Sequence, residues 1–185
     1  HDIAFIKFID PYIKTYYSYL LKQNAAPLIA AAAENLIIDK NTVLKDFQSI
    51  QDVNECLVVD GVSGLATPLS KNFLEEDLIK ILDLPLLMVV SAKTSTINNV
   101  ILSINHAKET GIKFRGVILG SYPENTDDVN IKLMPRLIEE YTDVKILGVL
   151  PSFDRNLNPN DLITEILNGV DIEAVFDVQI AKLQL

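Results

Sequence analysis

The most chemically suggestive stretch of the sequence is an acidic residue followed by a glycine-containing turn. Asp60 comes directly after the apolar run Cys56–Val59, which predicts a buried strand. Four residues follow Asp60: Gly61, Val62, Ser63 and Gly64. At the end of a strand, glycines let backbone N–H groups approach an anion, while a carboxylate can hold a metal ion or an amine. The alternative is a glycine-rich turn in which Asp60 only caps the turn or a helix.

A second polar stretch follows the apolar run Leu84–Val90. Four of its residues carry hydroxyl or amide side chains: Thr94, Ser95, Thr96 and Asn98. The hydroxyl side chains can cap the helix predicted over Thr96–Lys108. Alternatively, the free N–H groups at the start of that helix could bind a carboxylate or a phosphate.

Other candidate residues are few. Lys7 follows the apolar run Ile3–Ile6 and is either a surface residue or a group that faces an anionic ligand at a sheet edge. His1 and His106 are too isolated in the sequence to suggest a metal site or acid–base catalysis. Cys56 is the single cysteine, which excludes a disulfide framework and a multi-cysteine zinc site, and we expect an inert thiol in the core.

Composition excludes several classes of protein. The 185 residues carry 16 Lys and Arg against 25 Asp and Glu, a net charge of −9 without a basic stripe. This charge disfavours nonspecific binding to nucleic acid or to an anionic membrane surface. Hydrophobic residues make up 49% of the chain, which excludes a disordered protein, yet no apolar run approaches the ~20 residues of a membrane span. No secretory leader is visible, so a cytoplasmic protein is expected.

The elements that must position the candidate residues alternate between strands and helices. Five continuous apolar runs predict strands: Ile3–Ile6, Cys56–Val59, Leu84–Val90, Phe114–Leu119 and Lys145–Leu150. Helical spacing of apolar residues predicts seven helices: Ala25–Glu34, Asn41–Ile50, Leu74–Leu82, Thr96–Lys108, Asp127–Tyr141, Asn160–Leu167 and Ile172–Leu183.

Continuous apolar runs indicate strands that are covered on both faces. We therefore predict a single α/β domain over residues 1–185, with a mostly parallel sheet between helix layers. Residues 10–24 fit this scheme badly and are either an irregular loop or a junction between separated segments.

One phosphate-binding motif is absent from the sequence. None of the seven glycines is followed by Lys-Ser or Lys-Thr, so there is no Walker A loop. Because the sequence starts at His1 without a methionine, we expect it to begin inside a longer gene product. We also predict that a polypeptide of these 185 residues alone does not hydrolyse ATP. Measurable ATPase activity that is lost in Asp60→Ala would contradict this prediction.

Three stretches together resemble the dethiobiotin synthetase family. Val58–Leu69 is similar to the family's V-E-G-A-G-G-L-x-x-P-L, and Leu84–Asn99 is similar to L-P-V-x-L-V-V-x-x-x-L-G-T-I-N-H. Leu147–Pro151 is similar to L-G-x-L-P. The resemblance spans roughly residues 3 to 151 and implies a P-loop NTPase-like α/β fold. It also implies an enzyme that uses ATP and Mg²⁺ to close a ureido ring on 7,8-diaminononanoate with CO₂.

The resemblance implies a role for each candidate residue. Lys7 would neutralise the carbamate or the γ-phosphate, and Asp60 would be a Mg²⁺ ligand. The amides of Gly61–Gly64 would line the diamine. Thr94–Asn98 would hold the far carboxylate of the substrate, across the interface of a homodimer.

The sequence departs from the family pattern at several positions. Asp60 stands where the family has Glu, and Val62-Ser63 stands where it has Ala-Gly. Thr94-Ser95 replaces Leu-Gly. Gly120 replaces the Asn that reads adenine, although Gly120 and Pro151 would still lie at the nucleotide. Three functions therefore remain open: an ATP-dependent cyclo-ligase with its P-loop upstream, a non-catalytic binding or regulatory relative, and another P-loop-related α/β enzyme.

The helix over Thr94–Lys108 suggests an oligomer. Its apolar residues lie on more than one face, and we expect Val100 and Leu102 to lie partly outside the face that packs on the sheet. A second apolar face needs a partner, so the pattern and the resemblance predict an isologous homodimer. The alternative is that the C-terminal segment Ile172–Leu183 buries this helix.

Overall fold

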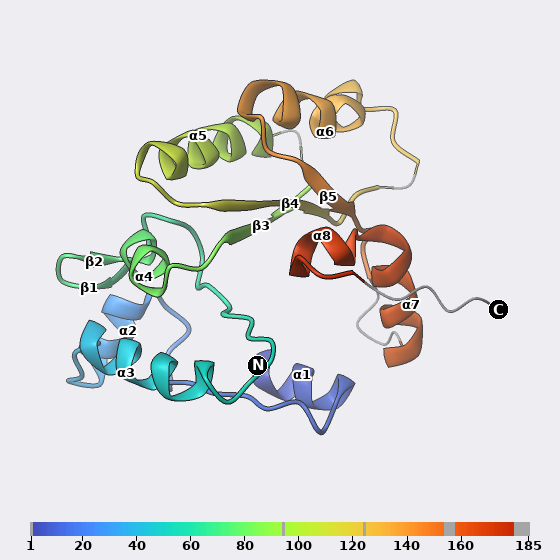
Figure 1. Cartoon of the computed structure of the whole chain (residues 1–185). Coiled ribbons are helices and arrows are strands. Elements are labelled where there is room, and N and C mark those ends of the chain that lie inside the picture. The colour runs from blue at the N-terminus through green and yellow to red at the C-terminus, as the bar shows by residue number, and fades with distance from the viewer. Residues whose placement is uncertain (1, 94, 124, 154–157, 180–185) are drawn as a thin grey trace. The chain divides into compact units, whose positions relative to one another are not determined.

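The computed structural model describes residues 2–93, 95–123, 125–153 and 158–179. It separates into two compact units, His1–Leu84 and Pro85–Leu185 (Figure 1). Each unit has its own helices and strands, and the single domain expected over the whole length stays a prediction.

In its described residues, the N-terminal unit contains four helices and a short hairpin. The helices are α1 (Asp2–Ile9), α2 (Pro27–Ala33), α3 (Lys40–Gln51) and α4 (Glu75–Leu82), and the hairpin pairs β1 (Pro68–Ser70) with β2 (Phe73–Leu74). Pro27 begins α2, where its missing N–H costs nothing. Asp39 caps α3, because its side chain accepts hydrogen bonds from two backbone amides of the first turn. Residues 10–24 contain turns and bends but neither helix nor strand, and both alternatives for this segment stay predictions.

Two predicted strands are absent from the described residues of this unit. Ile3–Ile6 lies within α1, and Cys56–Val59 forms no strand. An apolar run becomes a strand only where a neighbouring strand pairs its backbone groups, whereas a helix satisfies those groups locally. The thiol of Cys56 is free and exposed, so the prediction of an inert core cysteine is wrong.

The C-terminal unit confirms the parallel sheet. Its elements are β3 (Leu86–Ser91), α5 (Thr96–Glu109), β4 (Phe114–Gly120), α6 (Val129–Thr142), β5 (Ile146–Val149), α7 (Pro159–Gly169) and α8 (Ile172–Phe176). Strands β3, β4 and β5 pair in parallel in this order, so each helical crossover joins neighbouring strands. In the described part of the last predicted helix, Ile172–Leu183, the chain leaves the helical conformation at Asp177, whose φ is 56°. Residues 180–183 of this prediction lie outside the described residues.

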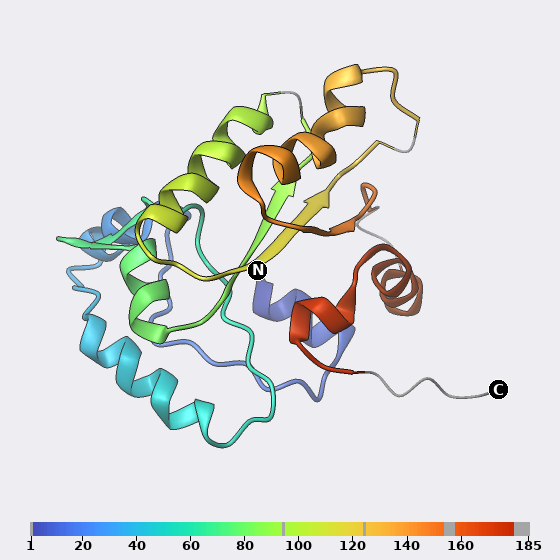
Figure 2. The same cartoon turned by 45° about the horizontal axis from the view of Figure 1, so that its top comes forward.

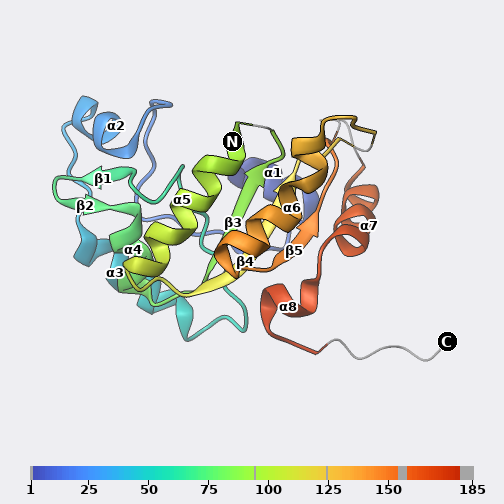
Figure 3. The same cartoon turned by 90° about the horizontal axis from the view of Figure 1, so that it is seen from above.

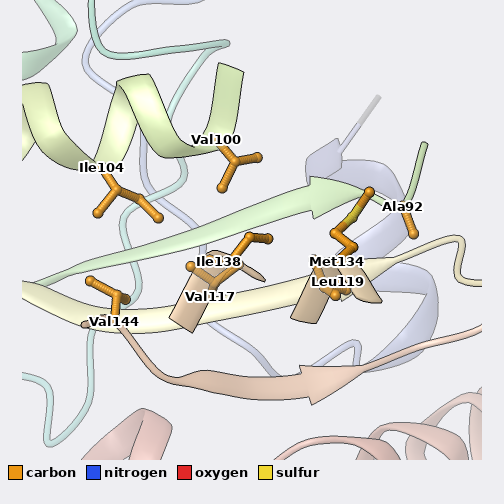
Figure 4. Packing of buried hydrophobic residues seen from close by; sticks show 8 residues of the cluster. All are labelled: Ala92, Val100, Ile104, Val117, Leu119, Met134, Ile138 and Val144. Atoms are coloured by element: carbon orange, nitrogen blue, oxygen red, sulfur yellow. The ribbon is translucent and has the colours of Figure 1, made fainter. Parts of the chain in front are cut away.

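Helices α5 and α6 lie side by side over one face of this sheet (Figures 2 and 3). Between them and the strands lies a buried apolar cluster (Figure 4): Ala92, Val100, Ile104, Val117, Leu119, Met134, Ile138 and Val144. Each large side chain buried in this way stabilises the fold by about 1.5–3 kcal/mol. Helix α8 packs against β4 and β5, on the sheet face opposite α5 (Figure 1). Val89 on β3 is 67% exposed, so the expectation that both sheet faces are fully covered does not hold at this strand.

Candidate functional site

The structure places the predicted site residues in two groups, one in each unit. The N-terminal unit holds Lys7, Asp60, Gly61, Val62, Ser63 and Gly64. The C-terminal unit holds Ser95, Thr96, Asn98, Gly120 and Pro151. Thr94 lies outside the described residues.

The turn after Asp60 is tied to the start of helix α4. The amide of Gly64 donates to Oγ1 of Thr67 at 3.1 Å, and the amide of Thr67 donates back to the carbonyl of Gly64 at 2.8 Å. The first two amides of α4, those of Glu75 and Glu76, donate to the carbonyls of Thr67 and Leu65, each at 2.9 Å. These bonds satisfy two of the amides that a helix N-terminus leaves without partners, and they fix the far end of the turn.

The near end of the turn contacts a buried carboxylate that sequence reasoning missed. Glu75 is only 6% exposed, and its side chain accepts a hydrogen bond from the backbone amide of Val62. Its Oε1 atom lies so close to Gly61 that a Cβ there would be 3.0 Å away. Within the described residues, its Oε2 atom is buried without a hydrogen-bond partner.

The environment of Glu75 raises the pKa of its carboxyl above the ordinary value of 4.5. Burial is the largest cause, because it disfavours the charged form. The hydrogen bond from Val62 opposes this shift, and the negative charge of Asp60 adds to it. Asp60 itself is exposed and caps none of the described helices, which removes the helix-cap alternative for this residue.

The raised pKa predicts how stability depends on pH. The contribution of Glu75 to the free energy of unfolding is fully present below pH 4.5 and is lost as pH rises through its folded-state pKa. Relative to Glu75→Gln, the unchanged protein should therefore lose stability between pH 4.5 and pH 7. Urea unfolding of both proteins at the two pH values measures this difference. Glu76→Gln is the control, and equal differences at both pH values would contradict the assignment.

Lys7 does not lie at the end of a strand. It is half-buried in helix α1, and its Nζ atom donates a hydrogen bond to the carbonyl of Ile13 in the following loop. The predicted position at a sheet edge is wrong because the preceding apolar run is helical.

The carboxyl ends of the three parallel strands meet at one edge of the C-terminal unit. The amide of Ala92, just after β3, donates to the carbonyl of Gly120 at the end of β4, at 2.9 Å. The amide of Leu150, just before Pro151, donates to the carbonyl of Leu119 at 2.7 Å. Open α/β sheets bind ligands beyond this edge. A Cβ at Gly120 would have its nearest neighbour, the carbonyl oxygen of Val90, at 3.9 Å. Glycine in place of the family's Asn therefore leaves open space at this position.

Helix α5 begins beside this edge without a side-chain cap. Ser95 occupies the N-cap position, but its hydroxyl makes no capping hydrogen bond. The expectation that hydroxyl residues cap this helix therefore fails at Ser95. The amide of Thr96 donates to the carbonyl of Lys93 at 2.8 Å, and the side-chain amide of Asn98 donates to Oδ1 of Asn99 at 3.2 Å.

A Mg²⁺ ion fits the donor chemistry at Asp60. In the part of the chain that the structure describes, no three His, Cys, Asp or Glu side chains converge on one point. Mg²⁺, however, is commonly held by one or two carboxylates together with substrate phosphates and waters. The exposed carboxylate of Asp60 is a donor of this type.

Comparison with known proteins decides the family. A family profile described as an AAA domain matches residues 3–160. The ATP-dependent dethiobiotin synthetase BioD of Bacillus licheniformis is 30% identical over 162 residues, which cover 86% of this chain and 67% of that protein. The chain belongs to the dethiobiotin synthetase family. The family assignment confirms the resemblance seen in the sequence, and the parallel α/β unit fits the P-loop NTPase-like fold.

Other dethiobiotin synthetases match over a similar range. The BioD protein of Bacillus velezensis is 32% identical over 139 residues, or 75% of this chain and 59% of the relative. That of Thermodesulfovibrio yellowstonii is 29% identical over 165 residues, or 85% of this chain and 68% of the relative. The chain thus spans between 59% and 68% of the length of these three synthetases. None of the described helices is both long enough and apolar enough to cross a membrane.

Proposed function

We propose that this protein is an ATP- and Mg²⁺-dependent dethiobiotin synthase that closes the ureido ring of 7,8-diaminononanoate with CO₂. The similarity to relatives named ATP-dependent dethiobiotin synthetase, over 86% of the chain in one case, carries the proposal. The exposed Asp60, followed by a turn that is held to helix α4, supports it. A cytoplasmic location is part of the same proposal.

In the proposed reaction, one substrate amine adds to CO₂ and loses a proton, which gives a carbamate. ATP transfers its γ-phosphoryl group to the carbamate oxygen and leaves as ADP. The second amine then attacks the carbamate carbon, loses a proton and displaces phosphate, which closes the ring. Mg²⁺, when bound, would neutralise phosphate charge, and Asp60 is the residue that would hold it. The work of the chain is otherwise to position the reacting groups and to balance their charges.

The remaining site residues would bind the substrates. The turn Gly61–Gly64 would line the diamine, and Ser95, Thr96 and Asn98 at the start of α5 would hold its distant carboxylate. The amides of Gly64 and Thr96 would have to leave their present acceptors in the chain to take part. Gly120 and Pro151, at the carboxyl edge of the sheet, would contact the nucleotide. The Nζ atom of Lys7 would have to leave the carbonyl of Ile13 to neutralise a carbamate or phosphate.

The second candidate is a relative that binds ligands without catalysis. The departures at Asp60, Val62-Ser63 and Gly120 favour it, because they change the metal ligand, the turn and the adenine contact. The full-length gene product, incubated with 7,8-diaminononanoate, bicarbonate, ATP and Mg²⁺, separates the two functions. Dethiobiotin detected by mass spectrometry supports the synthase, and its absence from a folded, ATP-binding protein favours the non-catalytic relative.

A homodimer is also part of the proposal, and one of the two residues expected at its interface is buried instead. Val100 was expected to lie partly outside the core, but it is 2% exposed and belongs to the apolar cluster under α5. Leu102 is 60% exposed and remains available to a partner. The alternative in which Ile172–Leu183 buries α5 is wrong for α8, which packs on the opposite sheet face.

Sedimentation of the full-length protein at micromolar concentration tests the dimer. We expect a dimer that Leu102→Glu shifts toward monomer, because a charge on an apolar contact is costly to bury. The matched control is Gln48→Glu, which adds the same charge at an exposed position of helix α3 and should leave the dimer intact. A monomer at this concentration removes the proposal that Ser95–Asn98 completes a neighbouring subunit's site.

A further inference from the structure

The buried carboxylate of Glu75 has no role in the proposed reaction as described so far. Its two acidic neighbours in the first turn of α4 have evident partners: Glu76 lies 3.7 Å from Nζ of Lys80, and Asp77 accepts a hydrogen bond from the amide of Leu74 at 2.9 Å. Glu75 instead turns inward and is 6% exposed. Burial of a carboxylate is costly unless its hydrogen bonds compensate, so the contacts of Glu75 need an explanation.

Helix α4 does not require Glu75 as a cap. The carbonyls of Leu65 and Thr67 already accept the first two helical amides. The carboxylate of Glu75 contacts a different part of the loop, the backbone between Asp60 and Ser63. It accepts the hydrogen bond from the amide of Val62, and its Oε1 atom lies against Gly61.

This contact leaves little space for a side chain at the glycine that follows Asp60. A Cβ at Gly61 would lie 3.0 Å from Oε1 and 3.7 Å from Cδ of Glu75, so a larger residue would make the carboxylate shift by a few tenths of an ångström. Gly64, at the other end of the turn, has no atom within 4 Å of such a Cβ. The two glycines therefore differ: only Gly61 is in close contact with the Glu75 side chain.

We propose that Glu75 is a positioning residue that holds the Gly61–Val62 backbone and thereby sets the direction of Asp60 and of the amides of this turn. The inference rests on the proposed function in one respect, namely the identity of the ligands that the turn binds. The contact itself, in which the Glu75 carboxylate fixes the Gly61–Val62 backbone, does not depend on that function. Glu75 acts through Gly61 and Val62 and does not itself touch substrate.

Hydrogen exchange at the Val62 amide of the full-length protein tests the contact directly. Glu75→Ala removes the acceptor, and we expect exchange at Val62 to become at least ~10-fold faster, because an amide without its hydrogen bond exchanges more readily. Glu75→Gln keeps an acceptor oxygen without the charge and should stay close to the unchanged protein. Glu76→Ala, in the same helical turn, is the matched control. Unchanged exchange in Glu75→Ala, or equal acceleration in Glu75→Gln, would overturn the proposal.

A second variant keeps the test decisive if Glu75→Ala does not fold. Gly61→Ala disturbs the same contact from the side of the turn and should also speed exchange at Val62, whereas Gly64→Ala should not. Equal exchange in both glycine variants would count against the proposal.

Kinetics of the full-length protein link the contact to the site. We expect Glu75→Ala to raise the KM for the diamine and for Mg²⁺ at least ~5-fold, with Glu75→Gln restoring most of the loss, because positioning depends on the hydrogen bond. If the unchanged protein forms no dethiobiotin, the proposed function fails, and the exchange experiment still decides the role of Glu75. If activity is present and both KM values are unchanged in Glu75→Ala, the positioning role fails instead.

Discussion

Replacing Asp60 with Asn should remove most of the proposed Mg²⁺-dependent turnover if the full-length protein is active, lowering kcat/KM by ~100-fold or more. The substitution keeps the shape of the side chain and removes the charge that attracts the ion. Asp60 is exposed and lies next to the turn that is hydrogen-bonded to the N-terminus of α4. The substitution should therefore lower activity without unfolding the protein. Initial rates over a range of Mg²⁺ concentrations measure the effect.

Two further variants make the Asp60 result specific. Asp60→Glu restores the residue that the family pattern has at this position and should keep or raise activity. Asp52→Asn removes the same charge from an exposed residue that ends helix α3 in the same unit, and it should leave the rate unchanged. Equal rates in Asp60→Asn and in the unchanged protein would make Asp60 a turn residue only.

The parallel sheet could be predicted from the sequence because a local apolar run marks each strand and the strand–helix pattern repeats along the chain. Leu84–Val90, Phe114–Leu119 and Lys145–Leu150 each lie within two residues of the observed β3, β4 and β5 at both ends. Each strand is separated from the next by one helix with clear apolar spacing, so neighbours in the sequence are neighbours in the sheet.

The two strands predicted for the N-terminal unit failed for a non-local reason. Ile3–Ile6 and Cys56–Val59 have the composition of strands, but in the described residues no other strand pairs with either of them. The apolar residues of the first run also recur at helical spacing, so a helix satisfies its backbone without any partner. An apolar composition indicates that a segment favours burial, whereas strand formation depends on a partner strand that can be distant in the sequence.

The candidate site was predictable only where a motif marked it. Motif order and spacing predict roles for the turn from Asp60 to Gly64 and for Gly120 and Pro151, and these roles stay predictions. Glu75 was not, because three consecutive acidic residues at a helix start are typical of an exposed first turn. Nothing in the local pattern indicates that only the first of them is buried against a turn earlier in the chain.

The second large expected effect is that of replacing Gly148 with Ala, which should change the stability of the fold rather than turnover. A Cβ at this position would lie 2.8 Å from both the carbonyl oxygen of Gly169 and Cγ2 of Val170, and 3.1 Å from Cα of Val170. Two of these atoms are backbone, held where Val170 pairs with Gly148 and the amide of Asp171 donates to the carbonyl of Leu147 at 2.7 Å. We therefore expect Gly148→Ala to lower the free energy of unfolding by about 2–3 kcal/mol.

Gly120→Ala is the matched control, since it makes the same change at the end of the neighbouring strand. Its added Cβ would have only the carbonyl oxygen of Val90 within 4 Å, at 3.9 Å, so stability should change by less than about 1 kcal/mol. Urea unfolding of both variants measures the difference. The result decides why the family motif L-G-x-L-P contains its glycine: a destabilised Gly148→Ala assigns it to the packing of β5 against the junction of α7 and α8. A stable Gly148→Ala with weakened ATP binding would assign it to the nucleotide instead.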